Sequence, residues 1–117
     1  SSSSFSGVGQ ANRIREVLDR NPQVRLWFSG HTHRPVTSEG QAVKKGNTWF
    51  FGLGSTFYTL IPPAGRGGSG SGTGGLEHDF EANMSRLIDI YADRVVVRVR
   101  DHREGKWLGN LEVSIPR

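Results

Sequence analysis

The apolar run Val24–Phe28, followed at once by the loop Gly30-His31-Thr32-His33, places the strongest constraint on the fold of this chain. Only Arg25 interrupts the run, as expected of a mostly buried strand in a parallel sheet. Before it, Gln10–Arg20 has apolar residues at helical spacing, and Asn21-Pro22 ends this predicted helix. A helix, a buried strand and then a polar loop predict an α/β arrangement, with the loop at the strand's carboxyl end, where such sheets bind ligands.

Two histidines in this loop are candidate metal ligands. Neutral imidazole is the commonest metal ligand among side chains, and His31 and His33 are separated by one residue. In an extended backbone, residues i and i+2 point to the same side, so we expect both imidazoles to converge on one ion or on two adjacent ions. Gly30 allows a sharp turn and Pro35 ends the segment. The alternative is a pair of surface histidines that bind nothing.

The stretch Phe28-Ser29-Gly30-His31-Thr32-His33-Arg34-Pro35 resembles the last metal-binding motif, Gly-His-x-His, of the calcineurin-like metallophosphoesterases. The resemblance implies hydrolysis of phosphoesters with two divalent metal ions, for which Mn, Fe and Zn are the candidates. It also implies that His31 and His33 are metal ligands, whereas Thr32 is not. Arg34 is a candidate for binding the phosphate of a phosphoester substrate, and the alternative is that it faces solvent. No catalytic residue is assigned.

The earlier motifs of that family do not occur in this sequence, namely Asp-x-His, Gly-Asp-x-x-Asp and Gly-Asn-His-Asp/Glu. The resemblance therefore implies that residues 1–117 are the C-terminal portion, a single domain, of a metallophosphoesterase-type α/β sandwich. In this chain one helix would be followed by mostly β-strands and hairpins. Because most of the metal ligands would lie upstream, we expect the chain alone to be inactive.

Short strands are predicted after Pro35. The expected elements are a hairpin of Gln41–Lys44 and Thr48–Leu53 around Lys45-Gly46-Asn47, a strand Phe57–Ile61, a hairpin Asn83–Asp101, and a last strand Leu111–Ile115. In the second hairpin Val95, Val97 and Val99 alternate with other residues and predict one buried face.

Residues 62–82 are predicted to form a flexible Gly-rich loop or linker within the domain. Seven of the eleven residues from Gly65 to Gly75 are glycine, a composition typical of flexible coil. Whether this tract is natural or engineered is left open. The group Glu77, His78, Asp79 and Glu81 mixes carboxylates with imidazole, but we interpret it as a solvated acidic loop because its spacing fits no ligand geometry.

Charge and composition narrow the other function classes. The formal net charge is +4, and the densest basic run, Arg94 to Arg103, is interpreted as a solvated strand face. No aromatic residues interleave with these arginines, so a nucleic-acid partner is disfavoured, although nucleic acid stays open as a substrate. No apolar run reaches the roughly 20 residues that span a membrane. The chain has no cysteine, which gives no support for a secreted disulfide scaffold.

The compartment is left open, with the cytoplasm favoured, and so is the oligomeric state. A competing function class also remains open. In that class the chain is a non-catalytic β-rich binding or structural domain, and its histidine pair is incidental. Upstream sequence with the family's earlier motifs would distinguish the two classes.

Overall fold

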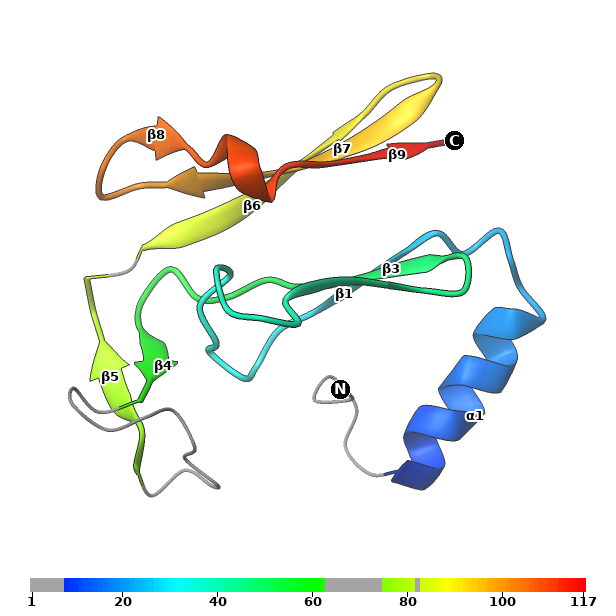
Figure 1. Ribbon diagram of the computed structural model, residues 1–117, viewed down its shortest axis with the longest axis horizontal. Helices are drawn as coiled ribbons and strands as arrows, with labels where there is room; N and C mark the ends of the chain where they lie inside the picture. Colours follow the sequence, from blue (N-terminus) through cyan, green and yellow to red (C-terminus); the bar gives the residue numbers. More distant parts are fainter. Residues whose placement is uncertain (1–7, 63–74, 82) are drawn as a thin grey trace.

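The computed structural model describes residues 8–62, 75–81 and 83–117, and shows a small α/β fold with one α-helix and several small sheets (Figure 1). The helix is α1 (Val8–Asp19). The first sheet has the strand order β1 (Leu26–Ser29), β3 (Thr48–Gly52), β2 (Ala42–Lys45). A two-stranded ribbon pairs β4 (Thr59–Ile61) with β5 (Glu77–Asp79). In the third sheet, β7 (Arg94–Asp101) pairs with β6 (Met84–Ile90), β8 (Lys106–Trp107) and β9 (Val113–Pro116).

The predicted helix over 10–20 is confirmed, with an earlier start. Its C-terminal turn is held by Asn21, whose side-chain Nδ2 donates to the carbonyl oxygen of Val17 at 2.8 Å. This bond satisfies one of the carbonyls that a helix end leaves without an intrahelical partner. Ile14 and Leu18 on the apolar stripe are half-buried.

The first sheet combines a parallel pair with a hairpin. β1 and β3 run parallel, with Leu26 opposite Trp49 and Ser29 opposite Gly52. β2 and β3 form the predicted hairpin, and Gly46 in its turn has φ +59°, a left-handed conformation that glycine adopts without strain. The predicted parallel character of the strand after α1 is thus confirmed.

The hairpin predicted over 83–101 is also present, as β6 and β7. Its valines at 95, 97 and 99 are buried on one face, as the alternation predicted. Val96, on the opposite face, is buried as well, which the alternation did not predict.

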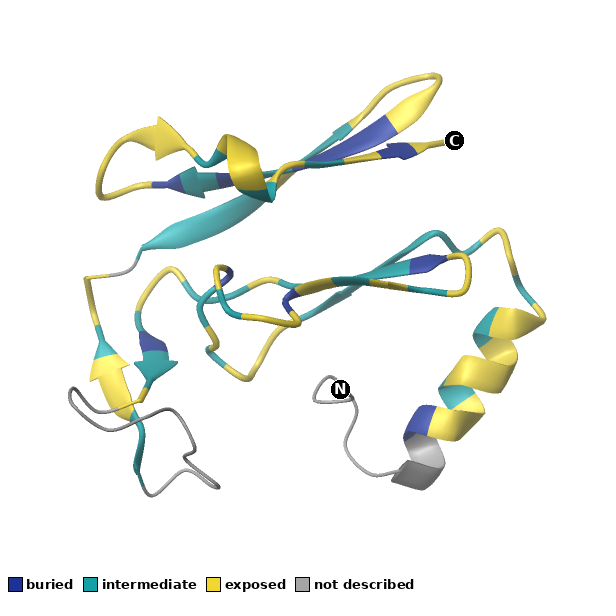
Figure 2. Ribbon diagram, viewed as in Figure 1, coloured by how far each residue is buried: buried dark blue, intermediate teal, exposed yellow. Residues whose placement is uncertain are grey.

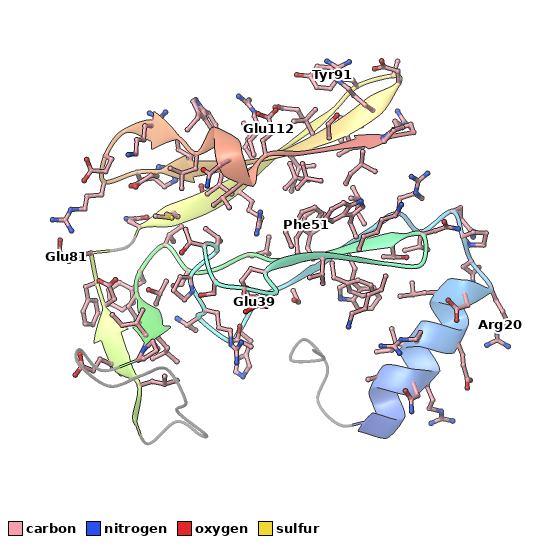
Figure 3. The ribbon with its side chains drawn as sticks, viewed as in Figure 1. Arg20, Glu39, Phe51, Glu81, Tyr91 and Glu112 are labelled. Carbon is pink, nitrogen blue, oxygen red and sulfur yellow. The ribbon has the colours of Figure 1, made fainter. Side chains whose placement is uncertain are left out.

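The hydrophobic core lies between the first and third sheets (Figure 2). Its buried centre is Phe51, Val95, Val97 and Ile115, with Leu26, Phe28, Trp49, Ile88 and Val113 packed against it. Figure 3 shows Phe51 on the side of β3 that faces the third sheet. Strands with alternating apolar residues bury one face in this way, and the two inner faces together form the core.

Arg86 on β6 joins the two sheets through the same interior. Its Nε donates to the carbonyl oxygen of Gly52 at 2.7 Å, and its NH2 group donates to that of Gln41 at 2.9 Å. The guanidinium carbon also lies 5.1 Å from the ring centroid of Phe51. Burial lowers the pKa of Arg86, because desolvation disfavours its charged form.

The region predicted as a loop over 62–82 differs in part from the prediction. Glu77–Asp79 forms β5, so this segment is a strand and not the solvated acidic loop that its composition suggested. Residues 63–74 and 82 lie outside the described residues, so the flexibility of the Gly-rich tract stays a prediction, as does the single-domain organisation of 1–117. No helix among the described residues has the length and apolar character needed to cross a membrane.

Candidate functional site

The loop with the two histidines lies at the carboxyl edge of the parallel strand pair. It follows β1 directly, and the segment Leu53–Ser55 follows β3 at the same edge because the two strands are parallel. The backbone N–H of Leu53 donates to the carbonyl oxygen of Ser29 at 2.9 Å, which holds the two segments together. Ligand sites in parallel sheets lie beyond this edge, so the position agrees with the expectation from the sequence.

The backbone conformation of the loop differs from the extended one that was expected. His31 has φ 81° and His33 has φ 53°, and in the described residues these are the only non-glycine residues with positive φ. The expectation that both side chains point to one side because the backbone is extended is therefore wrong, since two left-handed residues turn the chain instead. Such conformations are costly for non-glycine residues and concentrate at functional sites.

The His33 side chain is held by Tyr58. Its Nδ1 lies 3.1 Å from the carbonyl oxygen of Tyr58. Because a carbonyl can only accept, Nδ1 carries the proton in this bond, and in the neutral ring Nε2 keeps its lone pair. The rings of His33 and Tyr58 also stack, with centroids 4.3 Å apart. The backbone of His33 is held as well, since its carbonyl oxygen accepts from the N–H of Leu60 at 2.8 Å.

The other predicted site residues lie on the surface. His31 and Arg34 are exposed, and among the described residues neither makes a side-chain hydrogen bond. Arg34 lines a cavity of about 220 Å³, together with Thr32, Pro35, Ser38, Leu60, Pro62 and Leu76. The candidate phosphate-binding residue thus faces a concave site next to the histidine loop.

The ligands present do not complete a metal site on their own. Within 8–62, 75–81 and 83–117, no group of three or more His, Cys, Asp or Glu side chains is placed to hold a metal ion. Two imidazoles can contribute to a site, and the His33 tautomer fits a ligand role, but a site for two ions needs further ligands.

Tyr58, which contacts His33, and three further aromatic residues around it were not predicted to belong to the site. Phe57, Tyr58, His78 and Phe80, from β5 and the segments flanking β4 and β5, form an aromatic cluster in which neighbouring ring centroids lie 4.6 to 6.0 Å apart. Tyr58 is in contact with all three other members and with His33. The only sequence signal for this cluster was the aromatic pair Phe57-Tyr58, because the strand that brings His78 and Phe80 alongside was not predicted.

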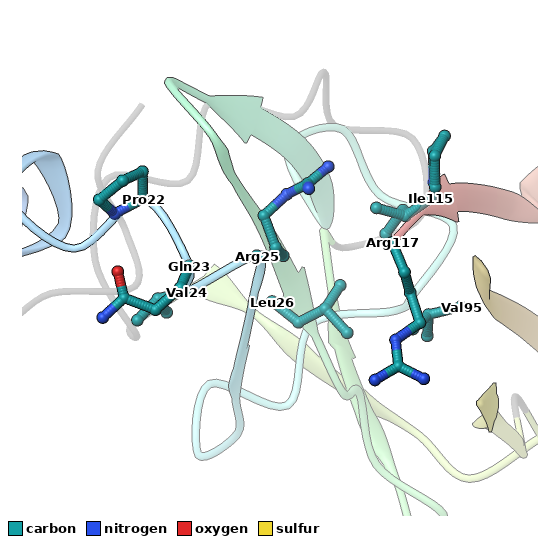
Figure 4. A pocket seen from close by; sticks show the side chains of 9 residues that line it. Pro22, Gln23, Val24, Arg25, Leu26, Val95, Ile115 and Arg117 are labelled. Carbon is teal, nitrogen blue, oxygen red and sulfur yellow. The ribbon is translucent and has the colours of Figure 1, made fainter. Parts of the chain in front are cut away.

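A larger cavity, of about 560 Å³, lies at the amino end of β1, away from the histidine loop (Figure 4). Its walls are mainly apolar and include Pro22, Leu26, Val95 and Ile115. The charged side chains that line it are Arg25 and Arg117, and neither histidine of the loop contributes to it. This cavity is therefore separate from the candidate site.

Fold and site together define a small α/β protein with a histidine loop at the carboxyl edge of its parallel strands. The chain matches no protein-family model, and no curated protein or solved structure is detectably similar to it. Support for a function therefore comes from the histidine motif in the sequence and from the geometry of the site.

Proposed function

We propose that this chain is part of a phosphoester hydrolase of the calcineurin-like metallophosphoesterase type, in which His31 and His33 are metal ligands. The observation that supports this most is the bond from His33 Nδ1 to the Tyr58 carbonyl oxygen, at 3.1 Å. Histidines that bind metals almost always donate their other ring N–H to a carbonyl or carboxylate, which fixes the tautomer and the ring orientation. His33 has this arrangement, with Nε2 as the free ligand atom.

The setting of the loop gives further support. Its two left-handed histidines lie beyond the carboxyl ends of parallel strands, and the surrounding hydrogen bonds hold this costly backbone in place. A core shared by two sheets agrees with the α/β sandwich that the sequence resemblance implies.

In the proposed site His31 and His33 contribute to two divalent ions, with Mn, Fe and Zn as candidates, because imidazole alone does not choose among them. The remaining ligands come from outside the described residues. When bound, such ions stabilise the negative charge that develops on phosphoryl oxygens. Arg34 lines the cavity beside the loop, and in the proposed site it would donate two parallel hydrogen bonds to phosphate oxygens.

A second candidate is a non-catalytic β-rich binding or structural domain. It is favoured by the exposure of His31 and by the lack of a third ligand in the part of the chain that the structure describes. In that case the histidine loop would bind one ion weakly or none.

The two candidates are distinguished first by sequence. The proposal expects Asp-x-His and Gly-Asp-x-x-Asp motifs in the sequence encoded upstream of Ser1. A gene without such motifs upstream would contradict it.

The second test measures activity in the full-length gene product. His31→Ala and His33→Ala should each abolish most metal-dependent hydrolysis of bis(4-nitrophenyl) phosphate, because each removes a ligand, while the melting temperature stays close to that of the wild type. His102→Ala is the matched control. His102 is an exposed residue of a turn, and its Nε2 lies 2.7 Å from Oγ of Ser85 on β6. Because it does not belong to the histidine loop, activity should be retained. Wild-type turnover and metal content in both loop variants would overturn the proposal.

A further inference from the structure

The aromatic cluster of Phe57, Tyr58, His78 and Phe80 is continuous with the proposed metal ligand. The Tyr58 ring stacks on His33 at 4.3 Å and lies 5.5 Å from Phe57 and 5.6 Å from Phe80, measured between centroids. One ring, that of Tyr58, therefore separates both phenylalanines from the imidazole. The bond from the Leu60 N–H to the His33 carbonyl oxygen also ties this ribbon to the histidine loop.

Both phenylalanines keep most of their surface in water. Phe57 is 71% exposed and Phe80 is 58% exposed. In the part of the chain that the structure describes, the other exposed large aromatic side chains are Tyr91 and Trp107, and arginine guanidinium groups lie over both rings. Among the described residues no such cation covers Phe57 or Phe80. His78 stacks on Phe80 with centroids 6.0 Å apart, and the exposed part of both phenylalanine rings is accessible to a planar ligand.

The charges around the cluster favour one orientation of a bound ligand. Arg34 and the divalent ions proposed at His31 and His33 would supply positive charge on the loop side, whereas Glu77 and Asp79 belong to β5. An anionic phosphate is favoured at the loop and disfavoured beside the two carboxylates of β5. A neutral planar group is not repelled there, and it gains from stacking on aromatic rings.

We propose that the aromatic cluster binds a planar aromatic group, a nucleobase or an aryl ester group, of the phosphoester whose phosphate lies at His31 and His33. This inference rests on the proposed function and names its substrate class. The rings of Phe57 and Phe80 meet at an interplanar angle of 74° and form a corner. A planar group in this corner stacks on one ring and presents its edge to the face of the other, the two arrangements that aromatic pairs prefer.

The test compares two ligands that differ only in the base, adenosine 5′-monophosphate and ribose 5-phosphate. Each is titrated by NMR into the 117-residue chain in the presence of Zn²⁺. The nucleotide should bind about tenfold more tightly, since stacking of one base on aromatic side chains has this magnitude. The amides of Tyr58 and Phe80 should shift with the nucleotide only. Equal affinities for the two ligands would overturn the inference.

Variants test whether Phe57 and Phe80 cause the preference for the nucleotide. Phe80→Leu and Phe57→Leu should each reduce the preference for the nucleotide, without changing the affinity for ribose 5-phosphate. Tyr91→Leu is the matched control, because Tyr91 is also exposed but lies on the β6–β7 turn. An unchanged preference in both phenylalanine variants would contradict the inference. So would a dimer of the wild-type chain that Phe57→Leu dissociates, because a second copy would then cover the cluster.

A third variant separates this inference from the proposed function. His31→Ala should weaken both ligands by the same factor and leave their ratio unchanged, because the exposed His31, unlike His33, has no ring contact with the cluster among the described residues. If His31→Ala and removal of Zn²⁺ change neither affinity while Phe80→Leu still removes the preference, the proposed function fails. The cluster would then be a site for planar groups that is independent of any metal.

Discussion

Gly54 occupies a position that no other residue type fits without strain. It has φ +71°, and a Cβ atom there would lie 2.7 Å from Cγ1 of Val36, which is buried. The substitution Gly54→Ala should therefore cost about 2 to 3 kcal/mol of unfolding free energy, from the left-handed backbone and the clash together. Urea denaturation followed by circular dichroism measures this loss.

Gly40 provides the control for that prediction. It has φ +82°, but a Cβ atom added there would meet no other atom within 4 Å, so Gly40→Ala reports the backbone cost alone. This variant should lose about 1 kcal/mol. Equal losses of unfolding free energy in the two variants would show that the contact with Val36 adds nothing to the backbone cost.

At this scale the sequence singled out the residues of the loop but not how the structure holds them. His31, His33 and Gly30 were identified from their spacing and from the apolar run before them. The positive φ values of the histidines and the bond of His33 to Tyr58 were not predicted, because Tyr58 is 25 positions away in the chain. Its proximity depends on how β4 meets the loop, a tertiary contact with no local sequence signal.

Among the elements, β6 is linked to the first sheet through Arg86. Arg86→Ala removes its bonds to the carbonyls of Gly52 and Gln41. The Gly52 carbonyl loses this donor, whereas the Gln41 carbonyl still accepts from the N–H of Gly52 at 2.9 Å. We expect a loss of about 2 to 4 kcal/mol in unfolding free energy. Arg94→Ala is the control, since Arg94 pairs with Asp93 at the exposed β6–β7 turn and should contribute about 0 to 1 kcal/mol. Similar losses in both variants would mean that the inter-sheet bonds add little.

The second prediction for the elements concerns the connection between β4 and β5. Ile61 pairs with Glu77, so the two strand ends are already adjacent, and a short loop can join them. Deleting residues 67–74 should change the melting temperature little, because loop closure costs only about 0.6 kcal/mol per doubling of length. Differential scanning calorimetry of the deletion variant tests this. A large drop in melting temperature would show that the tract stabilises the fold.

The local sequence pattern explains why some elements were predicted and why β5 was missed. The helix, the β2–β3 hairpin and the β6–β7 hairpin have clear periodicity and turn residues. β5 consists of Glu77, His78 and Asp79, which give no apolar alternation, and it is a strand because β4 supplies its partner. The interleaving of Trp107 with Arg98 and Arg100 was likewise not predicted, since it arises from the pairing of β7 with β8.

For the whole molecule, the incomplete set of metal ligands among the described residues has a direct consequence. The 117-residue chain should not measurably hydrolyse bis(4-nitrophenyl) phosphate with added Mn²⁺, because two imidazoles cannot fix two ions in a catalytic geometry. The same chain should bind Zn²⁺ weakly in a calorimetric titration, and His33→Ala should abolish this binding. Mn²⁺-dependent turnover by the pure chain would show that no further ligands are needed.

The parallel pairing of β1 with β3 also has a consequence for the timing of folding. β2 and β3 are joined by a tight turn and can pair early, whereas β1 must wait for the closure of the whole segment from Gly30 to Asn47. The carboxyl edge that holds the histidine loop is therefore completed late. In pulse-labelling hydrogen exchange during refolding, we expect amide protection in the β2–β3 hairpin to precede the capacity to bind metal. On this account, a metal ion bound at the proposed site would be captured only after the first sheet has formed.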